Sequence, residues 1–278
     1  MGLIMDGKLV SNSIRIHLKE EIALFAKRKP KLTTVLVGND EGAKVYIRNK
    51  EKACAEVGIL SEQVYLPEDT DENNLYKVIQ TLNQDATVDG ILIQMPLPKN
   101  LNNEKIIQTI SPEKDVDCLH PYNLGLLCAG NAMFTPNTPQ SVISMLEFYN
   151  IPIQGKKVVV IGRSNIVGKP VALLLLEKHA TVTICHSKTE NLPAITKQAD
   201  ILVVAIGKAE MVTGDFIKPG AVVCDVGINA VNGKITGDVA FDSVFPIASF
   251  VTPVPGGIGS LTTTLLLKNT VKAFRMHQ

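Results

Sequence analysis

Short apolar runs alternate with polar stretches of helical periodicity along the first half of the chain. Two runs rich in β-branched residues, 32–37 and 90–94, have the length and composition of buried strands. Between them, apolar residues recur every three or four positions over 44–57 and 72–83, which predicts two helices. Strands that alternate with helices in this way indicate βαβ units and a mostly parallel sheet.

The same pattern is sharper in the second half of the chain. Short, continuous apolar runs predict further strands of a parallel sheet that is covered on both faces: 158–161, 181–185, 201–205 and 221–226. A loop at 162–170 leads into a leucine-rich helix, and 261–274 predicts a last helix. We therefore expect an α/β protein with two domains, the second beginning with a helix at 140–149. The expected domains are 1–139, joined by the C-terminal helix 261–278, and 140–260.

The composition is that of a globular protein with an ordinary core. The chain has 278 residues, 45% of them hydrophobic, which suits two domains. Its 28 Lys and Arg balance 27 Asp and Glu, so we do not expect a partner such as nucleic acid, whose binding needs a cationic surplus. The chain has no Trp and an aromatic share of 5%, which disfavours a base-stacking surface.

Five scattered cysteines indicate reduced thiols in a cytoplasmic protein. They form no C-x-x-C pair and have no partnered His run, so no metal site is expected. No signal peptide is evident at the N-terminus. The most apolar segment, 171–176, is far shorter than the roughly 20 residues needed to cross a bilayer, so no membrane association is expected.

The clearest single motif is a glycine-rich turn, Gly162-Arg-Ser-Asn-Ile-Val-Gly168, between a buried strand and a helix. Such a turn lets the backbone approach a pyrophosphate while the helix N-terminus supplies free N–H groups. The motif is not the standard G-x-G-x-x-G, because Ser164 stands at the middle glycine and the last glycine comes one residue late. Dinucleotide binding and an ordinary tight turn both remain open on this spacing.

The end of the following strand bears on the choice of dinucleotide. NAD sites usually place an acid there to hold the ribose hydroxyls. This chain instead continues Cys185-His-Ser-Lys-Thr189, without a carboxylate. Ser187 and Lys188, together with Arg163 in the turn, could bind a 2′-phosphate, so we expect NADP rather than NAD. The alternative is that Arg163 and Lys188 are solvated surface charges.

A second group of polar residues lies in the first half of the chain. Tyr46 and Lys50 are four residues apart on a predicted helix and so share a face. This pair suits hydride-transfer chemistry, but the pair taken alone favours a tyrosine packed along a lysine stem. Its position just after a strand and a loop, at the strand's carboxyl end, makes a functional role more plausible. Gln94 ends a buried strand, and Asp117 closes an acidic motif ahead of an apolar turn.

In this order, the motifs resemble those of the bifunctional methylenetetrahydrofolate dehydrogenase/methenyltetrahydrofolate cyclohydrolase family, and the resemblance covers nearly the whole chain. Three matching segments lie in the first half: the Tyr46…Lys50 helix, Gly90-Ile-Leu-Ile-Gln94-Met-Pro-Leu-Pro98 and Pro112-Glu-Lys-Asp-Val-Asp117. The other three are the glycine-rich turn, Asp225-Val-Gly-Ile-Asn229 and Thr252-Pro-Val-Pro-Gly-Gly257, the most distinctive of the six.

The resemblance implies two αβα domains with mostly parallel sheets, a Rossmann-type NADP-binding domain at the C-terminal side, and a cleft between them. It implies oxidation of 5,10-methylenetetrahydrofolate with NADP, followed by hydrolysis to 10-formyltetrahydrofolate. Lys50 corresponds to the catalytic lysine and Gln94 to the residue that positions it. Tyr46 corresponds to the ring that contacts the folate, and Asp117 to the acceptor for the pterin N–H groups.

The resemblance also implies the cofactor contacts and a homodimer formed through the cofactor domain. Arg163 and Ser187 would contact the NADP phosphate, and Ile228 would line the cofactor. The Pro255-Gly256-Gly257 loop would line cofactor and folate. The remaining cofactor-binding residues are expected in the glycine-rich turn: Gly162, Ser164, Ile166 and Gly168.

The chain departs from the family pattern at five positions. Ala43 stands where the family usually has Ser, and Cys118 stands where it has Gly. Asn137 and Ser141 replace the Cys and the Gly of a P-C-T-P-x-G segment, and Ser260 replaces a proline. None of these changes removes a residue expected to act in catalysis.

Two other functions are possible for such a sequence. Short-chain dehydrogenases also combine a Tyr-x-x-x-Lys pair with a glycine-rich turn, but in them the turn precedes the pair, the reverse of the order here. A dinucleotide sensor without enzymatic activity would keep the fold, since a fold alone does not prove a reaction.

Overall fold

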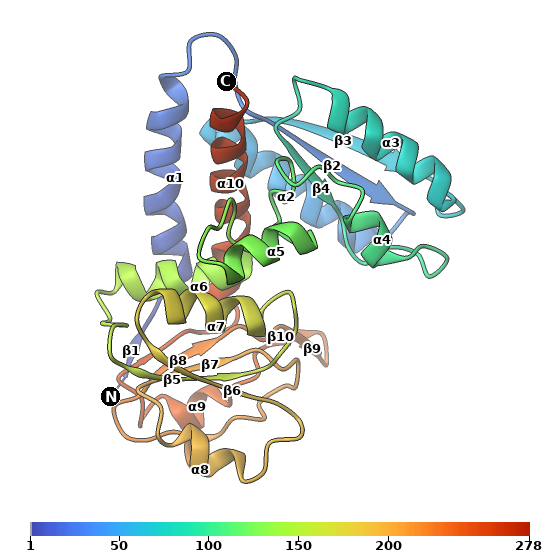
Figure 1. Cartoon of the computed structure of the whole chain (residues 1–278). Helices are drawn as coiled ribbons and strands as arrows, with labels where there is room; N and C mark the ends of the chain where they lie inside the picture. The colour runs from blue at the N-terminus through green and yellow to red at the C-terminus, as the bar shows by residue number, and fades with distance from the viewer. Residues whose placement is uncertain (1) are drawn as a thin grey trace. The chain divides into compact units, whose positions relative to one another are not determined.

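The chain forms two compact α/β units in a computed structural model that describes residues 2–278 (Figure 1). The first unit consists of Ser13–Thr135 and Thr263–Gln278, and the second of Pro136–Thr262 with the N-terminal segment up to Asn12. The expected division placed that segment in the first domain, and the structure differs. The reason is backbone pairing, because β1 (Leu3–Ile4) is a parallel neighbour of β11 (Phe250–Val251).

The sheet of the first unit has three parallel strands in the order β3-β2-β4. They span Leu60–Leu66 (β3), Lys31–Val37 (β2) and Gly90–Ile93 (β4). The helices of this unit, one of which (α1) begins in the N-terminal segment, are α1 (Gly7–Ala23), α2 (Glu41–Val57), α3 (Glu72–Gln84), α4 (Asn103–Ile107), α5 (Pro121–Cys128) and α10 (Thr262–Met276).

Each face of this sheet has its own apolar core. Leu32 and Leu92 point to the face covered by α1, α2 and α10, where Phe134 is fully buried. Val35 and Ile91 point to the other face and pack against α3. This alternation along β2 and β4 produces the αβα layering expected from the sequence.

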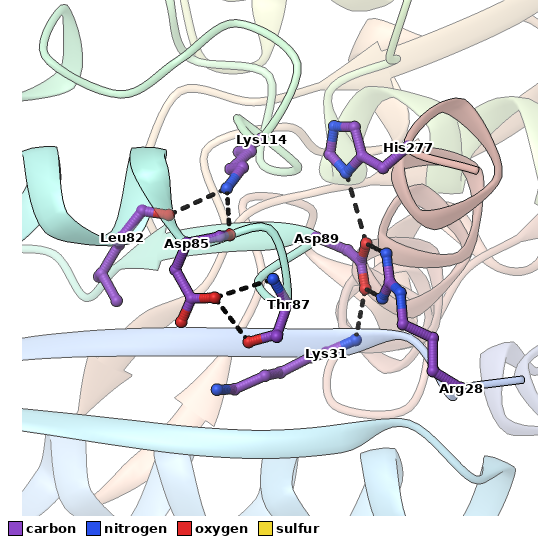
Figure 2. A network of polar contacts seen from close by, with 8 residues as sticks. All are labelled: Arg28, Lys31, Leu82, Asp85, Thr87, Asp89, Lys114 and His277. Carbon is purple, nitrogen blue, oxygen red and sulfur yellow. Dashed lines mark hydrogen bonds and ion pairs between the residues drawn. The ribbon is translucent and has the colours of Figure 1, made fainter.

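A buried carboxylate before β4 anchors the end of α10 within the first unit (Figure 2). Asp89 accepts two hydrogen bonds from the Arg28 guanidinium, at 2.7 and 2.8 Å, and one from the backbone N–H of Lys31 at 2.8 Å. Its Oδ1 also lies 3.3 Å from Nδ1 of His277. One side chain therefore joins the start of β2, the start of β4 and the C-terminal residues.

The sheet of the second unit has six parallel strands in the order β1-β11-β8-β7-β5-β6. Its remaining strands are β5 (Lys157–Ile161), β6 (Thr181–Cys185), β7 (Ile201–Val204) and β8 (Val222–Asp225), with a separate hairpin of β9 (Asn229–Val231) and β10 (Lys234–Thr236). The helices are α6 (Asn137–Phe148), α7 (Gly168–Glu177), α8 (Leu192–Thr196) and α9 (Phe241–Val244), with short 3-10 turns η1 (Gly214–Phe216) and η2 (Ile258–Ser260).

The strand order of the second unit creates a switch point at β5. The chain passes from β5 to β6 on one side and then returns to β7 on the other. Helices α6 and α7 lie on one face of the sheet, and α8 and α9 on the opposite face (Figure 1). Open α/β sheets bind ligands outside the carboxyl ends of the strands at such a switch point. The glycine-rich turn follows β5 at this place.

The structure confirms the fold class, an α/β protein with two mostly parallel sheets. One local difference is the start of α7, which begins at Gly168 inside the expected loop 162–170. No helix among residues 2–278 combines the length and the apolar character that crossing a membrane requires.

Candidate functional site

The first group of candidate residues lies on α2, directly after β2. Asp40 is the N-cap of this helix, and its carboxylate accepts the backbone N–H of Ala43 at 2.6 Å. The bond uses only the backbone at Ala43, so the Ser-to-Ala departure leaves the cap intact. The cap fixes the first turn of α2, from which Tyr46 and Lys50 follow one turn apart on the same face.

The ammonium of Lys50 is held by Gln94 at the end of β4. Nζ of Lys50 donates to Oε1 of Gln94 at 2.8 Å, and Nε2 of Gln94 donates to the carbonyl of Met95 at 2.9 Å. The backbone N–H of Gln94 continues the ladder by donating to Val35 at 2.9 Å. The amide oxygen is therefore turned toward Lys50 by a neighbour that is itself fixed in the sheet.

Burial lowers the pKa of Lys50 below that of a free lysine. The negative charge of Asp117 acts in the opposite direction, as does, more weakly, the thiol of Cys54. Asp117 is thus near enough to Lys50 for their charges to interact. Tyr46 differs from its neighbour because its side chain is 60% exposed and presents a ring to solvent.

The segment that carries Asp117 is fixed by two buried charges that the sequence reasoning did not single out. Lys114 donates to the carbonyls of Leu82 and Asp85 at the end of α3, at 3.0 and 2.7 Å (Figure 2). Burial lowers the pKa of this lysine. The only available signal was its position inside the motif, since its partners lie about 30 residues earlier.

Asp115 fixes the same segment to the residues that follow it in the chain. Its carboxylate accepts the backbone N–H groups of Leu119 and His120, at 3.2 and 2.8 Å, and Nδ2 of Asn123 at 2.9 Å. Burial raises the pKa of Asp115, and these hydrogen bonds oppose that rise. Asp117 is consequently presented by a backbone that is held on both sides.

Cys118 turns the chain immediately after Asp117. Its φ is 58°, in the left-handed region that favours glycine, and its thiol donates to the carbonyl of Phe134 at 3.3 Å. Burial raises the pKa of this thiol, so it stays protonated. The departure from glycine therefore retains the turn and adds a packed side chain.

The other two departures with a visible contact lie in α6 of the second unit. Ser141 is buried, and its hydroxyl donates to the carbonyl of Asn137, one turn earlier in the same helix, at 2.8 Å. The hydroxyl that Ser141 introduces is thus satisfied by a hydrogen bond within the helix. Ser260 ends η2, where the family has proline.

In the second unit, the two outer glycines bring the turn after β5 close to its neighbours. Gly162 has a φ of 133°, and a Cβ there would overlap the carbonyl oxygen of Ala205 after β7. A Cβ on Gly168 would overlap the backbone of Gly162. Both positions therefore require glycine for steric reasons, as a turn that approaches a phosphate group does.

The side chain of Ser164 stabilises this turn by hydrogen bonds to its own backbone. Its hydroxyl accepts the backbone N–H groups of Val167 at 3.1 Å and of Gly168 at 3.4 Å, at the start of α7. The hydroxyl thus has a structural task at the position where the standard motif has its middle glycine. Arg163 and Ile166 on the same turn are exposed.

The residues after β6 form a closed turn with Ser187 at its exposed tip. The backbone N–H of His186 donates to Oγ1 of Thr189 at 2.9 Å, and that of Lys188 donates to Nδ1 of His186 at 3.1 Å. Ser187 and the turn that carries Arg163 both follow neighbouring parallel strands, β6 and β5. Their side chains therefore lie at the same edge of the sheet.

The remaining expected residues follow β8 and β11. Ile228 is 62% exposed after β8. The Pro255-Gly256-Gly257 loop follows β11 and is held by the start of α1, because Gly7 donates its N–H to the carbonyl of Gly256 at 2.8 Å. Gly256 has a φ of 106° and so also favours glycine. The loop is part of the second unit, at the carboxyl edge of its sheet.

The structure thus forms two groups from the expected residues. Lys50, Gln94 and Asp117 come together in the first unit, with Tyr46 one helical turn away. The expected cofactor-binding residues lie along the carboxyl edge of the sheet in the second unit. Among residues 2–278, no cluster of three or more His, Cys, Asp or Glu side chains could hold a metal ion.

Both units match known proteins. The catalytic domain of tetrahydrofolate dehydrogenase/cyclohydrolase matches residues 5–117, and its NAD(P)-binding domain matches residues 136–278. A bifunctional protein FolD from Exiguobacterium sibiricum is 50% identical over 275 residues, covering 98% of this chain and 99% of that protein.

Solved structures agree with this match. The FolD methylenetetrahydrofolate dehydrogenase/cyclohydrolase of Campylobacter jejuni is 42% identical, with a TM-score of 0.97 and complete coverage of both chains. The Trypanosoma brucei enzyme, in complex with NADP and an inhibitor, is 38% identical with a TM-score of 0.93, covering 99% of this chain and 98% of that one.

Proposed function

The chain belongs to the tetrahydrofolate dehydrogenase/cyclohydrolase family, and we propose that its chemistry is carried by four residues of the first unit: Lys50, Tyr46, Gln94 and Asp117. The resemblance read from the sequence motifs is confirmed. The enzyme oxidises 5,10-methylenetetrahydrofolate to the 5,10-methenyl form and hydrolyses that product to 10-formyltetrahydrofolate, two reactions of one-carbon metabolism.

The observation that carries this assignment is the hydrogen bond between Lys50 and Gln94, combined with the lowered pKa of Lys50. In hydrolysis, a water adds to the methenyl carbon and loses a proton, for which the neutral amine of Lys50 is the acceptor. The C–N5 bond then breaks while N5 receives a proton, which the Lys50 ammonium supplies. The added hydroxyl loses its proton as the formyl group forms, so the net reaction releases one proton. A lysine whose pKa lies nearer neutrality serves both transfers.

Gln94 and Asp117 have different tasks in this scheme. Gln94 accepts a hydrogen bond from Lys50 without adding a charge, so it orients the amine and leaves its pKa low. Asp117 has two carboxylate oxygens, which suit the adjacent amino and ring N–H groups of a pterin. The exposed ring of Tyr46 offers a flat surface for the folate.

Hydride transfer needs less from these side chains. When bound, NADP would supply the acceptor for the hydride of the methylene carbon, and no proton passes between substrate and enzyme in that step. The chain's task is to align the two carbons, which is the main source of rate in such a reaction. Lys50 therefore acts mainly in the hydrolytic step.

The second unit is suited to NADP. The turn with Gly162 and Gly168 is so closely packed that side chains at these two positions would overlap the backbone, and a turn of this kind suits a pyrophosphate. The exposed side chains of Arg163 and Ser187 stand at the same sheet edge and would bind the 2′-phosphate. Ile228 and the Pro255-Gly256-Gly257 loop would line the nicotinamide end and the folate.

We also propose a homodimer that forms through the second unit. Its strand β6 is an edge strand, paired only on the β5 side, and Ile184 on it is 42% exposed. An unpaired strand edge offers backbone groups with which another chain can pair. Light scattering on the purified protein measures the subunit number directly. The five cysteines are unpaired, and four are buried, which supports a reducing, cytoplasmic compartment.

The variant Lys50→Met tests the proposed catalytic role, with Lys52→Met, an exposed lysine of the same helix, as the matched control. Methionine keeps much of the stem volume and removes the amine. Cyclohydrolase turnover should fall at least about 100-fold, the lower limit for general acid–base help, and dehydrogenase turnover should fall less. If Lys50→Met kept full cyclohydrolase activity, a water chain or the substrate itself would be the proton carrier.

A further inference from the structure

Two buried carboxylates of the second unit have no part in the chemistry described above. Asp225 ends β8 and is 3% exposed, and Asp238 follows the β9–β10 hairpin and is fully buried. Neither belongs to any ion pair among residues 2–278. Burying two negative charges near each other without a cation is costly, so the arrangement needs an explanation.

Asp238 binds the loop that follows β7. Its Oδ2 accepts the backbone N–H groups of Ile206 and Gly207, at 2.7 and 2.9 Å, and its Oδ1 accepts that of Lys208 at 2.8 Å. Oδ1 also accepts Nδ2 of Asn229 at 2.9 Å. The carboxylate of Asp238 therefore fixes three consecutive backbone N–H groups after β7. It also holds Asn229, the residue at which the loop after β8 ends.

Asp225 joins Asp238 to two further segments. Its carboxylate accepts the backbone N–H groups of Gly227, Asp238 and Val239, at 2.9, 3.1 and 2.9 Å. Its own backbone N–H donates to Oγ1 of Thr252, at the start of the loop after β11, at 2.7 Å. The two aspartates thus form a continuous chain of hydrogen bonds, which we call the aspartate relay (Asp225 and Asp238).

Two glycines make the relay possible. A Cβ on Gly227 would overlap the carboxylate of Asp238, and a Cβ on Gly237 would overlap that of Asp225. The backbone of Gly227, two residues after Asp225, therefore packs directly against the carboxylate of Asp238. In the same way, the backbone of Gly237 packs against the carboxylate of Asp225. Neither glycine has a positive φ, so close approach is the reason for glycine at both positions.

Hydrogen bonds keep the carboxylate of Asp225 ionised at neutral pH in spite of its burial. Burial and, to a smaller extent, repulsion by Asp238 raise the pKa of Asp225 to about 6, while three backbone N–H groups oppose that rise. Together the two carboxylates receive seven N–H donors, and these replace the cation that is missing. Costly buried charge of this kind is concentrated at functional sites in proteins.

The relay joins the ends of three adjacent strands, β7, β8 and β11, at the carboxyl edge of the sheet. The loops after β8 and β11 carry Ile228 and the Pro255-Gly256-Gly257 segment. We propose that Asp238, acting through Asp225, is a positioning residue that holds the three loops at 206–208, 226–229 and 252–257 in the shape that binds the dinucleotide. The proposal rests on the proposed function, in which these loops line the NADP site.

This role predicts a separation of the two activities. The proton transfers of the cyclohydrolase reaction, measured without NADP at saturating methenyltetrahydrofolate, are assigned to residues of the first unit, so a shift of the Pro255-Gly256-Gly257 loop affects KM for the folate before it affects kcat. A defect in the relay should therefore raise KM and the dissociation constant for NADP and leave cyclohydrolase kcat near its normal value. A role in general stability would lower both activities through the amount of folded protein.

The main test is Asp238→Asn. An amide keeps the shape but offers one acceptor oxygen and turns its own N–H groups toward backbone N–H groups. Because hydrogen bonds to a charged group are each worth about one to two decades in equilibrium constant, the NADP dissociation constant should rise about 10-fold or more. The matched control is Asp200→Asn, at the amino end of β7, whose carboxylate binds Lys157 and Lys218. This control should leave both constants unchanged.

Asn229→Ala is the milder second variant, since it removes one of the four donors to Asp238 and leaves the backbone bonds. It should raise the NADP constant a few-fold with a smaller fall in the thermal midpoint than Asp238→Asn shows, and it decides the matter if Asp238→Asn does not fold. An unchanged NADP constant in a folded Asp238→Asn protein, or in Asn229→Ala, would overturn the proposal. Equal losses of both activities in folded protein would also overturn it. The unmodified protein tests the proposed function separately, because failure to reduce NADP with methylenetetrahydrofolate would contradict that function whatever the variants do.

Discussion

Arg28 and Asp89 form a two-bond ion pair in which the carboxylate is fully buried and the guanidinium side chain is about one third exposed. The guanidinium also lies 4.5 Å from the centre of the Phe274 ring on α10. The hydrogen bonds to Asp89 and, to a smaller extent, its negative charge raise the pKa of Arg28, while partial burial opposes the rise. Because the same carboxylate receives Lys31 and approaches His277, the pair links α10 to the sheet of the first unit.

Asp89→Asn should therefore destabilise the first unit. The amide can accept from only one side and leaves the Arg28 charge without its partner. Breaking a buried ion pair costs about 3–5 kcal/mol, and partial exposure of Arg28 places the expected loss near the lower limit. Urea denaturation compares the variant with Asp85→Asn, whose carboxylate binds only exposed Thr87 and whose loss should be small. Equal denaturation midpoints for the two variants would contradict this account of Asp89.

Gln94→Glu should move the pH dependence of hydrolysis. A carboxylate at this position would stabilise the ammonium of Lys50 and raise its pKa, by about 1–3 units for an opposite charge at this distance. The neutral amine would then appear only at higher pH, so the rising limb of cyclohydrolase activity should shift upward by the same amount and activity at pH 7 should fall. A pH–rate profile measures the shift.

The control for this prediction is Gln84→Glu, an exposed glutamine at the end of α3. It adds the same charge far from Lys50 and should leave the pH–rate profile of the cyclohydrolase unchanged. A profile of Gln94→Glu that coincided with that of the unmodified enzyme would show that Lys50 is not the titrating group.

Most strands that were predicted from sequence are buried on both faces, and the exception is the edge strand β6, whose run of β-branched residues predicted it although it is largely exposed. Residues 32–37 and 158–161 are continuous apolar runs, and the structure has strands there. The strand β3 was not predicted, because its sequence mixes polar and apolar residues and its side chains are at most half-buried. Edge strands of this kind are stabilised by pairing with β2, which the local sequence does not reveal.

The residues of the candidate site also fall into two groups, those that a local sequence motif reveals and those whose partners are distant in the sequence. Lys50, Gln94 and Asp117 could be named because each lies in a compact motif. Lys114 and Asp238 act through backbone groups about 30 residues away, and no local pattern marks such partners. The role of Ser164 was also hidden, since only the structure shows that its hydroxyl caps the turn.

Asp117→Asn should weaken folate binding far more than NADP binding. The carboxylate can accept from two pterin donors, whereas an amide directs its own N–H groups at one of them. The loss of one charge-assisted pair should raise the folate dissociation constant about 10- to 100-fold. Isothermal titration with each ligand separately measures both constants, with the exposed Glu113→Gln in the same motif as the control. If NADP binding fell as far as folate binding, Asp117 would be a structural residue.

Arg163→Ala should reduce the preference for NADP over NAD. Arg163 is exposed on the turn after β5, and no ion pair within residues 2–278 engages it, so its charge is available to a 2′-phosphate. A charge-assisted contact contributes about 1.5–3 kcal/mol, so the NADP constant should rise by one to two decades. The NAD constant should hardly change, because NAD has no phosphate at that position.

The dissociation constants of the unmodified protein for NADP and NAD test this prediction first. Equal values would contradict a phosphate site at Arg163 and Ser187. Lys178→Ala removes a cation from the other end of α7, where the side chain pairs with Glu147, and should leave both constants unchanged. Ser187→Ala removes a neutral donor and should raise the NADP constant less than Arg163→Ala does, because a bond from a neutral hydroxyl is weaker than one from a guanidinium. A double variant that lost no more than Arg163→Ala alone would mean that the turn after β6 does not contact the phosphate and that the turn after β5 alone selects NADP.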